Sequence, residues 1–115
     1  MMRTIEFYKQ QSGACPVEEF LDALDGKQAR KVAWVLDMVR TLPRPPTRFF
    51  KKLVGTELWE VRAEYGGNAF RLLGFFDGDD LIILASGFAK KTQKTPKQEI
   101  NTAERRMKDY FRRKS

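Results

Sequence analysis

Residues 81–88 read Leu81-Ile82-Ile83-Leu84-Ala85-Ser86-Gly87-Phe88, and residues 89–97 continue as Ala89-Lys90-Lys91-Thr92-Gln93-Lys94-Thr95-Pro96-Lys97. The first part is apolar on both faces of an extended chain, which is typical of a central, buried strand. The second part carries four lysines and no acidic residue. We therefore expect a buried strand to place these lysines at the mouth of a site for a polyanion.

Two further strands are predicted immediately before this run. Side chains alternate between polar and apolar over residues 58–65, and residues 69–76 also read as a strand. Gly66-Gly67-Asn68 forms a tight hairpin turn between them, because these residue types tolerate positive φ angles. Asp77-Gly78-Asp79 is a second turn that leads into residues 81–88. Together the three strands form a meander.

A helical hairpin is predicted before the meander. Pro16 suits the first turn of a helix, and apolar residues recur with helical spacing over residues 17–24. Asp25-Gly26 breaks this helix, and a second helix is expected over residues 27–41. Pro43 and the prolines that follow it end the second helix.

The two ends of the chain complete the predicted fold. Residues 3–9 alternate as a short strand, while Thr95 and Pro96 are typical of the N-cap and first position of a last helix. The expected order is β-α-α-β-β-β-α in a single domain of residues 1–115. We predict an α+β fold in which a small twisted sheet packs against the helical hairpin and keeps part of its other face open.

Composition narrows the possible functions. The 115 residues carry a formal net charge of +7, which favours a nucleic acid or an acidic protein as partner, with a solubilising surface as the alternative. The absence of histidine and the single cysteine, Cys15, exclude histidine-ligated zinc sites and an intramolecular disulfide. Residues 1–6 do not have the pattern of a secretory segment, and no apolar run approaches the roughly 20 residues of a membrane span, so we expect neither. We expect a cytoplasmic protein that uses no metal or other cofactor and has no membrane partner.

A second basic segment precedes the meander. Residues 40–56 contain five cations and no acidic residue, and Phe49 and Phe50 lie beside the lysines. Basic residues interleaved with aromatic ones suit a nucleic-acid surface, through phosphate attraction and base stacking. The alternative is that the rings anchor the loop and the charges are merely solvated; one phenylalanine belongs in the core in either case. The RNA-binding candidates in this segment are Arg48, Lys51 and Lys52. Lys94 and Lys97 of the first basic segment, residues 89–97, are two further candidates.

Arg62 and Arg71 are the residues most indicative of chemistry. Each lies within a predicted strand, and the Gly66-Gly67 hairpin brings the two strands together, so the arginines can share a face a few residues apart. Arg71 lies between apolar residues and needs a partner, because burying an unpaired charge is costly. The partner is either Glu60 or Glu64, in a structural role, or the phosphates of a ligand.

Four motifs resemble a known family. They are Pro16-Val17-Glu18-Glu19-Phe20-Leu21, Leu58-Trp59-Glu60-Val61-Arg62, Gly67-Asn68-Ala69-Phe70-Arg71 and the run from Gly87 to Pro96. The chain resembles the HigB-like branch of the RelE/ParE toxin superfamily, including its phage-derived members. The resemblance covers nearly the whole chain, and Phe-x-Lys-Lys-Thr-x-Lys-Thr-Pro is its most specific part.

The resemblance implies a RelE-like, microbial-RNase-type fold and a toxin of a type II toxin–antitoxin pair. Its RelE and HigB relatives cut mRNA in the ribosomal A site, so the implied partners are mRNA, the ribosome and a cognate antitoxin, acidic or of the helix-turn-helix kind. The catalytic residues implied by the matching motifs are Arg62, Arg71, Lys90 and Lys91. Some relatives use a histidine, which this chain lacks, or a C-terminal tyrosine, for which Tyr110 is the candidate.

These side chains are compatible with RNA cleavage by the 2′-hydroxyl. Arginines can stabilise the charge that develops at phosphorus, and a lysine crowded by other cations has a lowered pKa and can transfer a proton. Two alternatives remain. A ParE-like inhibitor of DNA gyrase would use the helical hairpin, with Trp34 and Met38 as contacts, although core packing is the expected role of both. A catalytically inactive relative would only bind nucleic acid.

Overall fold

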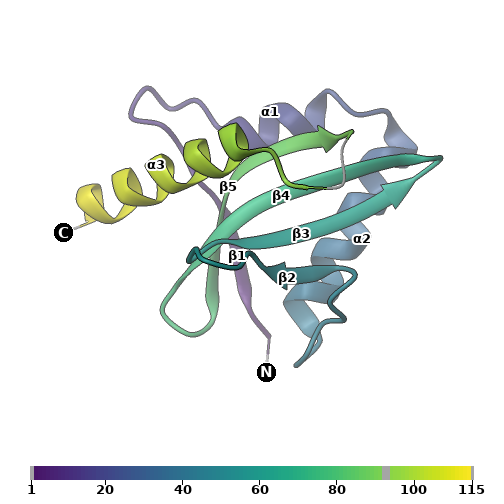
Figure 1. The fold of residues 1–115 in the computed structure, drawn as a ribbon, viewed down its shortest axis with the longest axis horizontal. Helices are drawn as coiled ribbons and strands as arrows, with labels where there is room; N and C mark the ends of the chain where they lie inside the picture. Colours follow the sequence, from purple (N-terminus) through teal and green to yellow (C-terminus); the bar gives the residue numbers. More distant parts are fainter. Residues whose placement is uncertain (1, 92–93, 115) are drawn as a thin grey trace.

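The computed structural model of the protein describes residues 2–91 and 94–114 and has an α+β fold (Figure 1). The elements run in the order β1 (Thr4–Phe7), α1 (Pro16–Asp22), α2 (Gly26–Thr41), β2 (Phe50–Lys52), β3 (Trp59–Tyr65), β4 (Asn68–Asp77), β5 (Leu81–Lys90) and α3 (Lys97–Lys114). The predicted fold class is confirmed. In the described ranges, no helix is long and apolar enough to cross a membrane.

The strands form one five-stranded sheet in the order β1-β5-β4-β3-β2. Strands β3, β4 and β5 are an antiparallel meander, and β1 pairs with β5 in parallel. Strand β5 therefore has a partner on each edge, in agreement with its apolar sequence. Gly66 and Gly67, with φ angles of 60° and 82°, make the turn between Tyr65 and Asn68. Positive φ is costly for most other residues, so these glycines help to fix the register of β3 against β4.

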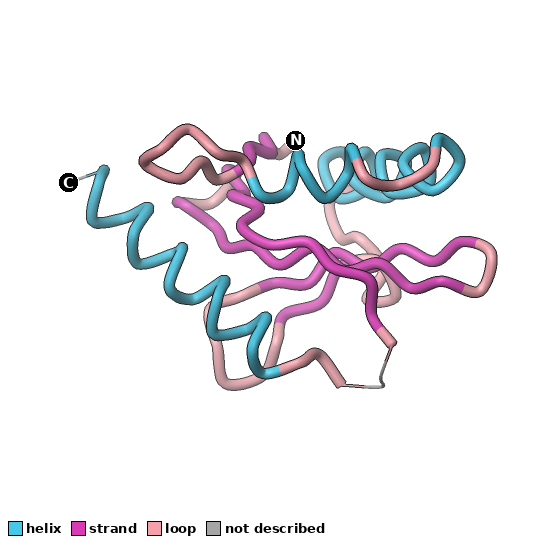
Figure 2. Tube along the Cα trace, turned by 90° about the horizontal axis from the view of Figure 1, so that it is seen from above, coloured by secondary structure: helices cyan, strands magenta, loops and turns pink. Residues whose placement is uncertain are grey.

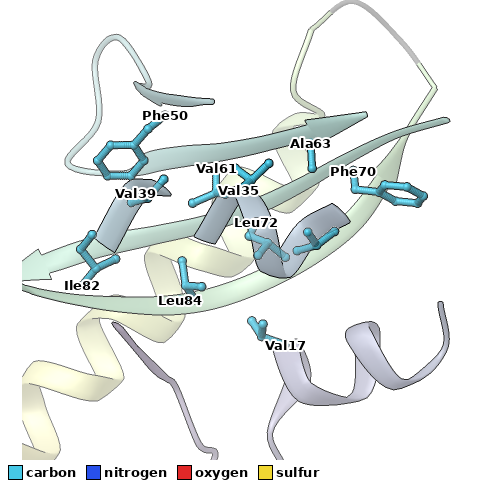
Figure 3. Packing of buried hydrophobic residues seen from close by; sticks show 11 residues of the cluster. Val17, Val35, Val39, Phe50, Val61, Ala63, Phe70, Leu72, Ile82 and Leu84 are labelled. Carbon is cyan, nitrogen blue, oxygen red and sulfur yellow. The ribbon is translucent and has the colours of Figure 1, made fainter. Parts of the chain in front are cut away.

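The sheet separates two apolar clusters. Figure 2 shows α1 and α2 on one side of the sheet and α3 on the other. Val17, Val35 and Leu72 belong to the cluster on the hairpin side (Figure 3). Leu73 and Ala103 belong to the cluster under α3. The sequence neighbours of Arg71, Phe70 and Leu72, belong to the hairpin-side cluster. Because successive strand residues point to opposite faces, the side chain of Arg71 points to the α3 side of the sheet.

The sequence does not predict strand β2. Residues 50–52 belong to an expected loop, but they pair antiparallel with β3 at the edge of the sheet. Three residues are too few to show an alternating pattern, and two of the three are lysines. The pairing matters for the site because it sets Lys51 opposite Glu60, on the same face of the sheet. Phe50 is buried and Phe49 is half-buried, as expected for one core phenylalanine.

Two further placements differ from those predicted. Trp34 is 50% exposed and does not extend the core, because the buried stripe of α2 runs through Val32, Val35 and Val39 on another face. Thr95 does not cap the last helix. Helix α3 begins at Lys97, and the hydroxyl of Thr95 donates a hydrogen bond to the carboxylate of Glu60 on β3.

Candidate nucleic-acid interface

Glu60 is the buried carboxylate around which the basic side chains of the sheet gather. It is 3% exposed, and its Oε2 accepts the hydrogen bond from Thr95. Its Oε1 lies 3.4 Å from Nε of Arg62 and 3.8 Å from Nε of Arg71. A buried carboxylate is strongly disfavoured unless it is paired, so these three partners account for its place in the sheet.

Arg62 and Arg71 lie directly opposite each other on β3 and β4, closer than the sequence predicts. Arg71 is buried, and its Nη1 donates to the carbonyl oxygen of Phe70 at 3.0 Å. Its Nη2 also lies 4.0 Å from Oε2 of Glu64, so both acidic partners considered from the sequence are near it. Burial lowers the pKa of Arg71, Glu60 opposes this shift, and the like charge of Arg62 adds to it.

A cavity of about 220 Å³, here called the lysine cavity, opens beside Glu60. It contains two of the predicted RNA-binding lysines and two of the predicted catalytic residues. Its lining consists of Lys51, Lys52, Leu53, Val54, Glu60, Arg62, Lys90 and Thr95. Four of these side chains are cationic and one is acidic, so the cavity has the charge that attracts a phosphate group.

Lys90 is the lining residue best suited to move a proton. It ends strand β5 and pairs with Ala69 of β4, which sets it on the same face as Arg71. Burial lowers the pKa of Lys90; Glu60 opposes this shift, and Arg71 and Arg62 add to it. A larger fraction of Lys90 is therefore neutral at a given pH than of an ordinary lysine, and the neutral amine can accept a proton.

A second cavity, of about 410 Å³ and here called the tryptophan cavity, lies on the other side of Arg62. It combines cations with aromatic rings, and Arg48, one of the predicted RNA-binding residues, belongs to it. The lining consists of Lys31, Trp34, Arg48, Phe49, Arg62, Glu64 and Arg71. Arg62 lines both cavities and so connects them.

Residues 19–108 match the family described as phage-derived protein Gp49-like (DUF891). The chain belongs to this family. The Gp49-like family is one of RelE- and HigB-like toxins, and membership supports the resemblance drawn from the four motifs. The matched region includes every residue that lines the lysine cavity. No curated protein sequence shows significant similarity to the chain.

Three of the predicted basic residues of this Gp49-like protein lie outside both cavities. Lys91, Lys94 and Lys97 are exposed, and none of them belongs to the lining of either cavity. Lys91 directly follows the last residue of β5, whereas Lys90 is still part of the strand. Thr92 and Gln93, which belong to the most specific sequence motif, lie outside the described residues.

Tyr110 lies outside the lysine cavity as well. Its hydroxyl donates a hydrogen bond of 2.7 Å to Oδ2 of Asp77, and its ring packs against Phe75. Burial, together with Asp77, raises its pKa to about 12. It lines a different and larger cavity of about 700 Å³, to which Cys15 also belongs. In this Gp49-like protein Tyr110 thus fastens α3 to the end of β4.

Sequence reasoning did not assign Glu60 and Thr95 to the site. A signal for Glu60 was present, since a glutamate two residues before Arg62 on a strand shares its face. No comparable signal marks Thr95, because its contact with Glu60 joins residues 35 positions apart and depends on the path of the loop after β5.

Proposed function

We propose that the chain is the toxin of a type II toxin–antitoxin pair and that it arrests translation by cutting mRNA on the ribosome. The observation that carries the proposal is the lysine cavity, where Lys51, Lys52, Arg62 and Lys90 surround the buried carboxylate of Glu60. Membership in a family of RelE- and HigB-like toxins supports the same conclusion.

The cations of the cavity would bind the scissile phosphate and stabilise the charge that develops on it. Arg62 lines the cavity, and Glu60 holds its guanidinium in place through the ion pair of 3.4 Å to Nε. Preorganised donors of this kind are usually the largest contribution to catalysis of phosphoryl and acyl transfer. Arg62 lines the lysine cavity itself. Arg71 does not line it, but it forms an ion pair with Glu60, which does.

The proton transfers are assigned to lysines because the chain has no histidine. The neutral amine of Lys90 accepts the proton of the 2′-hydroxyl as the 2′-oxygen attacks the adjacent phosphorus. The bond between phosphorus and the 5′-oxygen breaks, and the ammonium of Lys51 donates a proton to that oxygen. The products are a 2′,3′-cyclic phosphate and a free 5′-hydroxyl. No metal ion takes part in this scheme.

Glu60 acts as a positioning residue in this scheme. Its carboxylate lies between two arginines whose charges would otherwise repel across the strand pair. The hydrogen bond from Thr95 also ties the loop after β5 to the sheet and so helps to hold Lys90 at the cavity. The carboxylate is therefore assigned to holding the cations, and the proton transfers to the lysines.

The proposed partners follow from the same function. A toxin of this kind is neutralised by an antitoxin, which we expect to be acidic or a helix-turn-helix protein. The basic surface suits either that protein or the RNA of a ribosome. The exposed lysines outside the cavities, Lys91, Lys94 and Lys97, are assigned to guiding RNA towards the lysine cavity.

One observation favours a second candidate function, the inhibition of DNA gyrase. Trp34, on the helical hairpin that a ParE-like toxin would use, is 50% exposed. Induced expression in cells that lack the antitoxin separates the two functions. A toxin that cuts mRNA first stops the incorporation of amino acids into protein, whereas an inhibitor of DNA gyrase first causes DNA breaks. We expect incorporation to stop first, and expect Arg62→Ala to abolish the arrest; DNA breaks before any loss of incorporation would refute the proposal.

A further inference from the structure

The tryptophan cavity contains two aromatic rings, in contrast to the lysine cavity. Trp34 of α2 and Phe49, just before β2, meet edge to face with ring centroids 5.7 Å apart. Half of the Trp34 surface is exposed, although the rest of its helix buries an apolar stripe. An exposed indole held at a fixed angle by a second ring is a platform on which a flat, apolar face can stack.

Cations surround these two rings. Nζ of Lys31 lies 4.5 Å from the centre of the Trp34 ring, and the guanidinium carbon of Arg48 lies 4.7 Å from the centre of the Phe49 ring. Arg62 and Arg71 complete the basic lining, and Glu64 is its acidic member. A ligand that fits this lining presents both a planar face and a negative charge.

The tryptophan cavity lies next to the lysine cavity, and Arg62 lines both. Next to the β2–β3 pairing, the amide of Arg62 donates a hydrogen bond of 2.8 Å to the carbonyl oxygen of Phe49, the residue before β2. Beyond it the side chain of Arg62 crosses the sheet edge, where its Nη1 approaches the carbonyl oxygen of Thr47 at 3.5 Å. A single residue thus separates a cavity that suits phosphate from one that suits a base.

We propose that the tryptophan cavity is a nucleotide subsite, in which the base of a nucleotide next to the scissile phosphate stacks on Trp34 while Arg48 and Lys31 bind its phosphate. The proposal rests on the proposed function, since it takes RNA as the polyanion that binds the lysine cavity. The subsite adds a contact between the protein and a base. Because the bases of double-stranded RNA are already stacked on one another, this contact favours single-stranded RNA.

The lining favours a nucleotide over an acidic protein segment. Carboxylates would satisfy the cations but would leave the exposed indole uncovered, whereas a nucleotide uses both parts of the cavity. The volume of about 410 Å³ also lies in the range of sites for compact small ligands. An acidic protein remains the competing occupant in the experiment.

Fluorescence of Trp34 provides the test. The chain has two tryptophans, so Trp59→Phe leaves Trp34 as the reporter. The purified full-length variant is titrated with a short single-stranded 2′-deoxy oligonucleotide, which has no 2′-hydroxyl and cannot be cleaved by the proposed mechanism. Parallel titrations use an abasic oligomer with the same number of phosphates and a polyglutamate peptide of similar charge.

We expect the base-bearing oligonucleotide to quench Trp34 more strongly than the abasic oligomer and to bind more tightly. Trp34→Ala should weaken binding of the base-bearing oligonucleotide about tenfold and leave binding of the abasic oligomer unchanged. Tyr65→Ala, an exposed aromatic outside the cavity, should change neither. Lys31→Ala should weaken both more than Arg30→Ala, which removes an equal charge from an exposed position of the same helix.

Two results would contradict the proposal that the tryptophan cavity binds a nucleotide. One is equal affinity for the base-bearing and abasic oligomers, both with Trp34 intact and in the Trp34→Ala variant. The other is quenching by polyglutamate that equals quenching by the oligonucleotide, which would assign the cavity to an acidic protein. Neither result depends on cleavage. Loss of mRNA cutting with base-dependent quenching intact would instead refute the proposed function and leave the subsite in place.

Discussion

Arg62 and Arg71 lie opposite each other on neighbouring strands, and both turn their Nε atoms towards one oxygen of Glu60, at 3.4 Å and 3.8 Å. Like charges in directly opposed positions destabilise a sheet unless an opposite charge lies between them. The carboxylate of Glu60 thus makes the paired arginines compatible with a folded sheet. The arrangement couples stability to the same residues that form the proposed site.

Removing the charge of Glu60 should therefore destabilise the fold. Glu60→Gln keeps the size of the side chain but leaves Arg71 buried without its carboxylate, and breaking a buried pair costs about 3 kcal/mol. Urea unfolding measures the change. Glu64→Gln is the matched control, because that carboxylate is exposed and its contact with Arg71 is 4.0 Å long; its effect should stay below about 1 kcal/mol. Equal losses in the two variants would contradict the central role of Glu60.

Arg62→Ala should reduce RNA cleavage about 10²- to 10³-fold, which is the loss typical when one donor to a developing oxyanion is removed. Arg62 is partly exposed, so its removal should leave the fold intact, as circular dichroism can verify. Arg40→Ala serves as the control, since it removes a partly exposed arginine near the C-terminal end of α2, outside both cavities. Single-turnover cleavage of ribosome-bound mRNA gives the rates. Similar rates for the two variants would exclude Arg62 from the site.

The pH dependence of cleavage should report Lys90. Because the pKa of Lys90 is lowered from 10.5, the neutral amine forms at lower pH than in an ordinary lysine, and the rate should rise with pH below 10.5. Lys90→Arg should slow cleavage about 10²- to 10⁴-fold and remove this rise, since a guanidinium does not lose its proton. Lys91→Arg, the neighbouring exposed position, should keep the rise. Loss of the rise in Lys91→Arg alone would transfer the role to Lys91.

Tyr110 should contribute stability below its raised pKa. Its pKa in the folded chain is about 12, above the ordinary 10.0, so the contribution is complete below pH 10 and is lost as the pH rises through about 12. Tyr110→Phe should consequently lower the urea midpoint at pH 8, and the difference from the parent protein should shrink above pH 10. Tyr65→Phe controls for loss of a hydroxyl on the exposed hairpin. A difference that stays constant up to pH 12 would contradict the hydrogen bond to Asp77.

Local sequence patterns predict the sheet well. The apolar run of β5 has partners on both edges, and the two glycines at 66 and 67 form the turn that brings Arg62 opposite Arg71. These features are local, since they depend on the alternation of side chains and on backbone angles that few residues adopt. Strand β2 cannot be predicted in this way, because its three residues are too few to show an alternation of polar and apolar side chains.

The site is harder to predict because its contacts are long-range. Arg62 and Lys90 are identifiable as candidates from their positions on strands, but their common partner is not. Glu60 and Thr95 form a hydrogen bond although they lie 35 positions apart in the sequence. Likewise, Trp34 of α2 meets Phe49, which lies in the segment between α2 and β2. Both contacts depend on how helices and loops are placed against the sheet, which no local pattern encodes.

The most direct test of the proposed function is the fate of a defined mRNA incubated with the purified protein, with and without ribosomes and without added metal beyond that of the ribosome buffer. Primer extension locates new ends, and end-specific chemistry identifies the phosphate left behind. We predict cuts within the coding region only when ribosomes are present, with 2′,3′-cyclic phosphate and 5′-hydroxyl ends. Intact mRNA on translating ribosomes would contradict the assignment of the lysine cavity to RNA cleavage.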